Sequence, residues 1–313
     1  MTAKDHKDIA LVLAGGGAKG SFQVGALKVL YEHGYQFDVI SGVSVGALNG
    51  AMIATKQFEP LQQLWETIEQ DDILNHRSLG SVIKQFVLHK IGIAQPPLGL
   101  NNNKPLKRLL SNHLLGQQIK IPYHFGFVKL KTGDFVNAII RQKGHNINKD
   151  DILRILGSTA IPVKFDPVDF HGQLLVDGGI RNITPISEVL PYNPDRIVII
   201  PTEPYGENRK AKDNQADVSD ILQIAKQTVS IMLDEIFNQD IKRFLKTNHL
   251  VQQAKEHGIN LEKPNGLNYQ HIDPLIIAPK KKLGDALNFK RSKIDEHFEK
   301  GQQRARDILS SRE

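Results

Sequence analysis

Apolar runs and glycine-rich turns alternate at the start of the chain. Residues 8–14 form a short continuous apolar run closed by three glycines, a pattern typical of a strand that is covered on both faces. Apolar positions then recur at helical spacing over residues 21–33 and stop at a glycine. A second run at residues 39–40 leads into another small-residue turn and an alanine-rich helix. Strand, turn and helix, repeated in this order, predict a parallel α/β sheet.

Later apolar runs extend this predicted sheet. They lie at residues 125–130, 174–176 and 196–200, with a late addition at residues 275–278. The expected fold class is therefore α/β, with a mainly parallel central sheet and helices on both of its faces.

Two further stretches have the spacing of helices. Leu79, Val82, Ile83, Phe86 and Val87 would share one helix face, before a proline-rich loop interrupts the pattern. A longer pattern runs from residue 218 to about residue 249. Packing against the core explains either stretch. The first stretch is also a candidate for a lid or a membrane-facing cover, because it lies beside the glycine-rich turns in sequence.

Composition excludes several classes of protein. The chain has 313 residues and no cysteine, which rules out disulfides, thiolate nucleophiles and Cys-ligated metals. Its formal charge is +6, and we interpret its lysine clusters as a solvated face and expect no nucleic-acid partner, because no aromatic platform accompanies them. No apolar run reaches the roughly 20 residues that span a bilayer, and the first strand does not resemble a signal peptide. We expect a cytoplasmic protein that can also bind peripherally to a membrane.

The most informative motif is Gly42-Val43-Ser44-Val45-Gly46, which fits G-x-S-x-G. It sits where a strand turns sharply into a helix, and such a turn presents a strained, exposed nucleophilic serine between small neighbours. The helix that follows would favour negative charge near Ser44. The competing interpretation is a tight turn whose serine has no catalytic role. The strand-to-helix context favours a nucleophilic serine.

The first glycine-rich turn, Gly15-Gly16-Gly17-Ala18-Lys19-Gly20, leaves backbone N–H groups uncovered. Such groups hold either a phosphate or an oxyanion. The turn also satisfies G-x-G-x-x-G, so a dinucleotide site is an alternative, but that fingerprint requires an acidic residue at the end of the second strand. Asp38 precedes that strand, and the serine turn occupies its end.

A third turn, Asp177-Gly178-Gly179, directly follows the predicted strand at residues 174–176. We expect that strand to belong to the parallel sheet, which would place Asp177 at the same sheet edge as the two earlier turns. Alone this tripeptide is a common turn; together the three turns predict one site.

The three turns, in this order, resemble the signature of the patatin-like phospholipase family: an oxyanion loop with a basic residue, then G-x-S-x-G, then Asp-Gly-Gly. Residues 158–162 are similar to the family's small-residue stretch ending in proline, and Asn182 and Pro185 match its Asn-x-x-Pro. The resemblance covers about residues 8–200 and implies a three-layer patatin-like fold of compact bacterial type. We expect a catalytic domain at residues 7–205 and a helical extension at residues 206–313, packed on the same domain with its late strand near residues 275–278.

The resemblance implies a Ser-Asp dyad, with Ser44 as nucleophile and Asp177 as its base, and neither a metal nor a cofactor. It places the oxyanion donors in the backbone of Gly15, Gly16, Gly17 and Ala18. It gives supporting roles to Lys19, Gly20, Gly42, Gly46, Gly178 and Gly179. A carboxylate with the usual pKa near 3.9 is a poor base for a serine, so we expect burial beside an apolar acyl pocket to raise it.

A histidine base is the alternative to Asp177. The chain order of an α/β-hydrolase triad is Ser, acid, His, which leaves four formal candidates: His249, His257, His271 and His297.

The implied activity is hydrolysis of lipid acyl esters, such as phospholipids, lysophospholipids or acylglycerols, through an acyl-enzyme. An acyltransferase would use the same Ser44 intermediate, and a nucleotide-binding protein would use the loop at residues 15–20. A catalytically silent binding protein is a further alternative. The basic charge and the amphipathic stretch at residues 79–87 favour peripheral docking on anionic membranes. The sequence indicates no protein partner, oligomeric state or substrate selectivity.

Overall fold

The computed structural model describes residues 8–93, 96, 98–141, 144–205, 221–263, 266 and 268–312, apart from some side chains within residues 76–86 and 221–238. Its central sheet contains eight strands. These are β1 (Ile9–Leu13), β2 (Val39–Val43), β5 (Tyr123–Lys129), β6 (Phe135–Ile140), β7 (Val168–Phe170), β8 (Gln173–Asp177), β9 (Arg196–Ile200) and β10 (Asp273–Ile276). The strand order is β10-β9-β1-β2-β5-β8-β7, and β6 pairs with β5 outside this path.

The sheet is mixed but mostly parallel. Strands β10, β9, β1, β2 and β5 run parallel to one another, whereas β6, β7 and β8 form antiparallel pairs. This arrangement confirms the predicted α/β class. Strands β6 and β7 are additions to the prediction: β7 is only three residues long, and most of β6 is only half-buried, so neither gives a clear apolar run.

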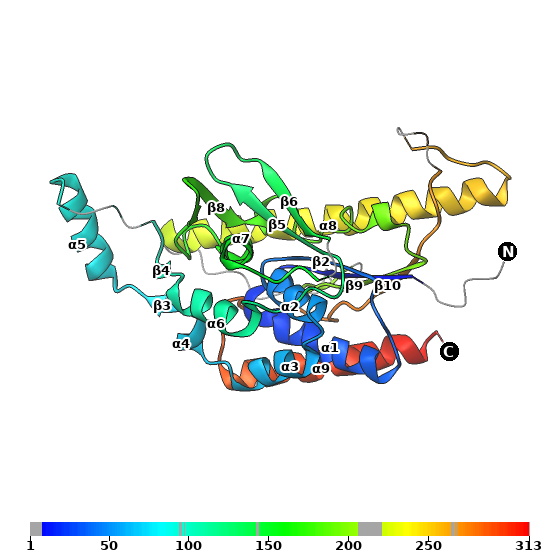
Figure 1. The fold of residues 1–313 in the computed structure, drawn as a ribbon, viewed down its shortest axis with the longest axis horizontal. Coiled ribbons are helices and arrows are strands. Elements are labelled where there is room, and N and C mark those ends of the chain that lie inside the picture. The colour runs from blue at the N-terminus through cyan, green and yellow to red at the C-terminus, as the bar shows by residue number, and fades with distance from the viewer. Residues whose placement is uncertain are drawn as a thin grey trace.

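Helices cover both faces of the sheet (Figure 1). Successive residues of a strand point to opposite faces; in β1, Leu11 and Leu13 join one core, and Ala10 and Val12 join the other. The first core is shared with α1 (Gly20–Glu32), α2 (Val45–Ala54), α3 (Phe58–Thr67), α4 (Gln70–Ile73), α6 (Lys104–Leu114), α7 (Lys149–Thr159) and α9 (Arg291–Ser310). The second core is covered by α8 (Ile221–Glu256).

The long pattern predicted to begin at residue 218 corresponds to α8, although residues 218–220 lie outside the described part of the chain. Phe237, Ile241 and Phe244 of α8 are buried in the second core, so packing explains this helix. Farther along, β10 forms a parallel pair with β9. The division of the chain at residues 205 and 206 stays a prediction.

Helix α5 (Leu79–Lys90) stands apart at one end of the molecule (Figure 1). It lies between β3 (Asn75–His76) and β4 (Asn101–Asn102), which pair as a short antiparallel ribbon. Ile83 and Val87 are 58% and 54% exposed, so core packing is the wrong interpretation for these two side chains. The side chains of Leu79, Val82 and Phe86 lie outside the description. No helix among the described residues is long and apolar enough to cross a bilayer.

The topology around β5 positions the candidate site. Strand β6 lies along one edge of β5, so β2 and β8 share the other edge and approach each other from opposite directions. Val43, the last residue of β2, pairs with Gly126, and Asp177, the last residue of β8, pairs with the next residue, Phe127. Asp177 therefore reaches Ser44 because β8 is antiparallel to β5. The expectation that it ends a parallel strand is wrong.

Candidate active site

Ser44 occupies a strained turn between β2 and α2. Its backbone has φ 56° and ψ −127°, a conformation that non-glycine residues rarely adopt. The flanking glycines make the turn possible, because a Cβ on Gly42 would lie 2.2 Å from the carbonyl oxygen of Gly46, and a Cβ on Gly46 would lie 2.2 Å from that of Leu13. The Ser44 N–H donates a hydrogen bond of 3.1 Å to Oγ of Ser158. This geometry is that of a nucleophile elbow.

Asp177 is buried at the end of β8, with only 3% of its surface exposed. Its Oδ1 accepts a hydrogen bond of 2.7 Å from the N–H of Gly179. Its Oδ2 makes no hydrogen bond to any described residue, although the Ser44 hydroxyl is near enough to lower the pKa of the carboxyl. Burial outweighs these two hydrogen-bond donors and raises the pKa of Asp177 to about 6. The carboxylate thus keeps one oxygen available for a proton and has a pKa near neutrality.

The end of α7 contacts both of these residues. Ser158 is fully buried and accepts from the Ser44 N–H, and the carbonyl of Ala160 accepts a hydrogen bond of 2.9 Å from the Asp177 N–H. One helix end therefore fixes the backbone of both members of the candidate dyad. From the sequence these residues were recognised only as a block similar to the family, because the spacing of α7 alone gives no sign of this role.

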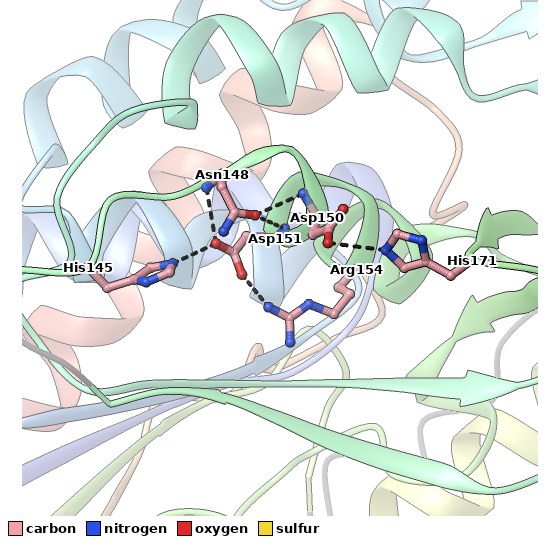
Figure 2. A network of polar contacts seen from close by, with 6 residues as sticks. All are labelled: His145, Asn148, Asp150, Asp151, Arg154 and His171. Atoms are coloured by element: carbon pink, nitrogen blue, oxygen red, sulfur yellow. Dashed lines mark hydrogen bonds and ion pairs between the residues drawn. The ribbon is translucent and has the colours of Figure 1, made fainter.

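The start of α7 is held by a polar network, shown in Figure 2. Asn148 and Asp151 form a reciprocal capping box. The carboxylate of Asp151 is fully buried, pairs with Arg154, and lies 2.7 Å from Nε2 of His145. Because this network anchors the start of α7, it also orients the end of α7, which accepts hydrogen bonds from the N–H groups of Ser44 and Asp177.

The glycine-rich loop lies against Ser44. Its donors are not equivalent, since the N–H of Gly15 is bonded to the carbonyl of Ile183 at 3.1 Å, and that of Ala18 to the carbonyl of Ala286 at 2.7 Å. The N–H groups of Gly16 and Gly17 have no acceptor among the described residues. Of the four donors expected from the sequence, Gly16 and Gly17 are the two that remain open for an oxyanion.

Buried side chains fix both ends of this loop. Gln23 donates from Nε2 to the carbonyl oxygens of Ala14 and Ile200, at 2.8 and 3.1 Å. Asn49 donates to Gln23 and accepts from the indole N–H of Trp65, each at 2.9 Å. No motif in the sequence marks these three residues, because their spacing along the chain is irregular.

Lys19, the basic residue of the loop, forms an ion pair with Glu203 just after β9. The lysine is buried, with 8% of its surface exposed. Its charge is therefore neutralised by a neighbouring carboxylate, and its structural effect is to tie the loop to the segment that follows β9.

An apolar cavity opens beside Ser44, with about 510 Å³ of space including its mouth. Gly17 and Ser44 lie at one end, and the walls come from helices α2, α3, α4 and α6 and from the C-terminal segment. The apolar wall residues include Leu48, Leu64, Trp65, Leu106, Phe165 and Phe289. The lining of this pocket could not be predicted from the sequence, because its walls come from segments far apart in the chain.

No histidine among the described residues forms a hydrogen bond with Ser44 or Asp177. His249, His257 and His271 are exposed. His297 is buried, but its Nε2 lies 2.7 Å from the carbonyl oxygen of Leu283. The geometry therefore favours the carboxylate of Asp177 as the base.

Comparison with known proteins gives a consistent result. The sequence profile of the family described as patatin-like phospholipase matches residues 11–190. The chain is 25% identical over 197 residues to the uncharacterized NTE family protein Rv1063c of Mycobacterium tuberculosis, a match that covers 61% of this chain and 48% of that protein. It therefore spans about half the length of that relative.

Two further comparisons extend this result. The chain is 27% identical over 190 residues to the uncharacterized protein YqhO of Bacillus subtilis, covering 56% of this chain and 64% of YqhO. The crystal structure of VipD from Legionella pneumophila shares the fold, with a TM-score of 0.51 at 15% identity; the match covers 97% of this chain and 67% of VipD.

The raised pKa of Asp177 predicts a pH-dependent gain in stability for Asp177→Asn. In the folded protein the carboxyl has a pKa of about 6, against 3.8 for the free side chain, so ionising it destabilises the fold above pH 6. We expect Asp177→Asn to raise the free energy of unfolding at pH 8 by up to roughly 3 kcal/mol. The gain should shrink as the pH falls from 6 to 4. Urea unfolding at five pH values measures it, and a difference that does not vary with pH would contradict the assignment.

Proposed function

Because the chain belongs to the patatin-like phospholipase family, we propose that it is a serine hydrolase of lipid acyl esters that uses Ser44 and Asp177 as a catalytic dyad. One observation carries the proposal. Ser44 stands on a strained elbow beside the unpaired Oδ2 of a buried Asp177, at the end of an apolar cavity. A nucleophile, a base and an apolar pocket meet at one point, which is the arrangement that ester hydrolysis requires.

The reaction follows from this geometry. Oγ of Ser44 attacks the ester carbonyl while Oδ2 of Asp177 takes the hydroxyl proton, and the N–H groups of Gly16 and Gly17 stabilise the oxyanion. The protonated Asp177 then donates its proton to the departing alcohol, which leaves the acyl group on Ser44. Water, deprotonated by Asp177, hydrolyses this acyl-enzyme and restores both residues.

The buried environment makes Asp177 a better base than an exposed carboxylate. A pKa of about 6, in place of the ordinary 3.8, reduces the difference between the pKa of the carboxyl and the much higher pKa of the serine hydroxyl. The group is still ionised at pH 7 and above, so it can accept the proton there. The apolar cavity would bind the acyl chain of the substrate. A bound chain would also keep water away from the carboxylate, which helps to keep its pKa raised.

The rival functions differ in their products or ligands. An acyltransferase would pass the acyl group from Ser44 to an added alcohol, so product analysis with such an acceptor distinguishes it from a hydrolase. A nucleotide-binding protein would need an acid for the ribose, but Asp38 accepts a hydrogen bond of 2.8 Å from the N–H of Ile9 at the start of β1. The structure offers no specific observation in favour of that alternative.

Exposed apolar side chains on and just after α5 suit contact with a lipid surface. We define the α5 patch as Ile83, Val87, Ile91 and Ile93, which are 58%, 54%, 62% and 71% exposed. Patches of this kind on a projecting helix mark interaction sites. The ribbon that carries α5 begins two residues after Ile73, which lines the cavity. We therefore propose that the α5 patch holds the cavity near an anionic membrane.

Substitution of the dyad tests the activity directly. We expect Ser44→Ala and Asp177→Asn each to reduce fatty-acid release from mixed phospholipid and lysophospholipid by roughly 10³-fold or more, because the two residues act as one unit. Ser41→Ala is the matched control, since Ser41 is a buried serine of β2 whose hydroxyl makes no hydrogen bond to described residues; it should keep its activity. Circular dichroism verifies folding. An active Asp177→Asn variant would contradict the assigned base.

The α5 patch predicts a defect in membrane binding. Ile91→Asp combined with Ile93→Asp should abolish flotation with anionic vesicles at low salt, because two charges replace the apolar contact. Leu115→Asp is the control, since Leu115 is 44% exposed at the end of α6, outside the patch, and this variant should float like the wild type. Equal flotation of all three proteins would refute docking through α5.

A further inference from the structure

A second, larger hollow lies on the other side of the sheet from the apolar cavity. We call it the rear groove; its walls are α8, residues 181–193, Lys263 and residues 269–272, and it encloses about 1120 Å³ including its mouth. It shares no lining residue with the cavity at Ser44. The proposed hydrolysis makes no use of it.

The rear groove is strongly cationic. Arg181 and Arg243 line it, and neither guanidinium is within hydrogen-bond or ion-pair distance of a described residue, although Arg243 is near enough to Asp240 to lower the pKa of that carboxyl. Lys263 also lines it; Nζ of this lysine lies 3.5 Å from Oδ1 of Asn193 and 5.6 Å from the centre of the Tyr269 ring. Asp240 is the one carboxylate among the lining residues. Three cations against one anion leave an excess of positive charge that a ligand can neutralise.

A buried hydroxyl in the groove also lacks a partner. Thr184 is 1% exposed, lines the groove, and its Oγ1 makes no hydrogen bond to any described residue. A buried polar group without a partner costs about 1–3 kcal/mol. A ligand oxygen placed between this hydroxyl and the arginines would remove that cost. The free hydroxyl and the two unpaired guanidinium groups therefore point to the same kind of ligand, an oxyanion.

Apolar side chains of α8 and of the segment just before β10 form part of the groove wall. Phe244, Val251 and Ile272 line the groove and are 9%, 6% and 6% exposed, so their accessible edges face its interior. Leu190 adds a partly buried side chain from the opposite wall. A small inorganic anion would leave this surface uncovered, whereas a ligand with an apolar chain would bury it.

We propose that the rear groove binds a single-tailed amphiphile with a phosphate monoester head group. Arg181 and Arg243 would hold the phosphate, since guanidinium groups match its geometry in a bidentate fashion. The hydroxyl of Thr184 would donate to a phosphate oxygen, and the tail would lie along Phe244 and Val251. The proposal does not depend on hydrolysis at Ser44.

The segment that follows Asp177 lines the groove and also contacts the candidate active site. Ile183 accepts from the N–H of Gly15 in the glycine-rich loop, while the N–H of Thr184 donates to Asp240 of α8 at 3.3 Å. Arg181 donates its own N–H to the carbonyl of Gly178 at 3.0 Å. The ligand would therefore sit directly behind the residues that position the dyad and the oxyanion loop.

Calorimetry with an ether-linked lysophosphatidate below its critical micelle concentration tests the proposal, because an ether cannot be hydrolysed by the wild-type protein. The double variant Arg181→Gln with Arg243→Gln should lose at least roughly tenfold in affinity. Lys242→Gln is the matched control, since Lys242 is an exposed cation of α8 that does not line the groove, and it should bind normally. The neutral alkylglycerol and inorganic phosphate should each bind more weakly than the full amphiphile.

The single tryptophan separates the two sites. Trp65 lines the apolar cavity, so its fluorescence reports a chain that enters there. Loss of calorimetric binding in the double variant, with an unchanged Trp65 response, assigns the lost site to the rear groove. Equal affinity in the double variant would overturn the proposal, as would equal affinity for the neutral analogue or for inorganic phosphate alone. If the protein released no fatty acid from esters, the proposed hydrolase function would be refuted, whereas this binding test would be unaffected.

Discussion

The candidate site depends on the shared edge of β5. A strand edge offers one row of backbone donors and acceptors, and β2 uses the row as far as Gly126 while β8 begins its pairing at Phe127. The ends of the two strands must therefore meet. This pairing brings Ser44 and Asp177 to one point, although they are 133 positions apart in sequence. The serine elbow, the proposed base and the apolar cavity are arranged around that point.

Burial at this junction sets the chemistry. A carboxylate that is removed from water and receives few hydrogen bonds is destabilised in its charged form, which raises its pKa and makes it a more effective base. The surrounding residues maintain this state. Ser158 and Ala160 hold the backbone of the candidate dyad, and Gln23 with Asn49 holds the ends of the glycine-rich loop. The backbone is thus fixed tightly, while Oδ2 of Asp177 stays free for a proton.

The parts of this structure that follow local rules could be predicted from the sequence. Continuous apolar runs gave β1 and β9, and the glycine spacing around Ser44 gave the elbow, because both depend on neighbours in the chain. The antiparallel direction of β8 could not be predicted, since it depends on which edge of β5 is already occupied. The cavity, the rear groove and the role of Ser158 were missed for the same reason: each is formed by segments that are distant in sequence.

The pH dependence of Ser44 modification tests the central claim, that Asp177 is the base, most directly. An alkyl fluorophosphonate reacts with an activated serine, and intact mass spectrometry follows its attachment without any choice of lipid substrate. If Asp177 must be ionised, the labelling rate should fall on acidification through a single step near pH 6, the pKa of its buried carboxyl. A labelling rate that is constant between pH 8 and pH 5, or a step that persists in Asp177→Asn, would contradict the account.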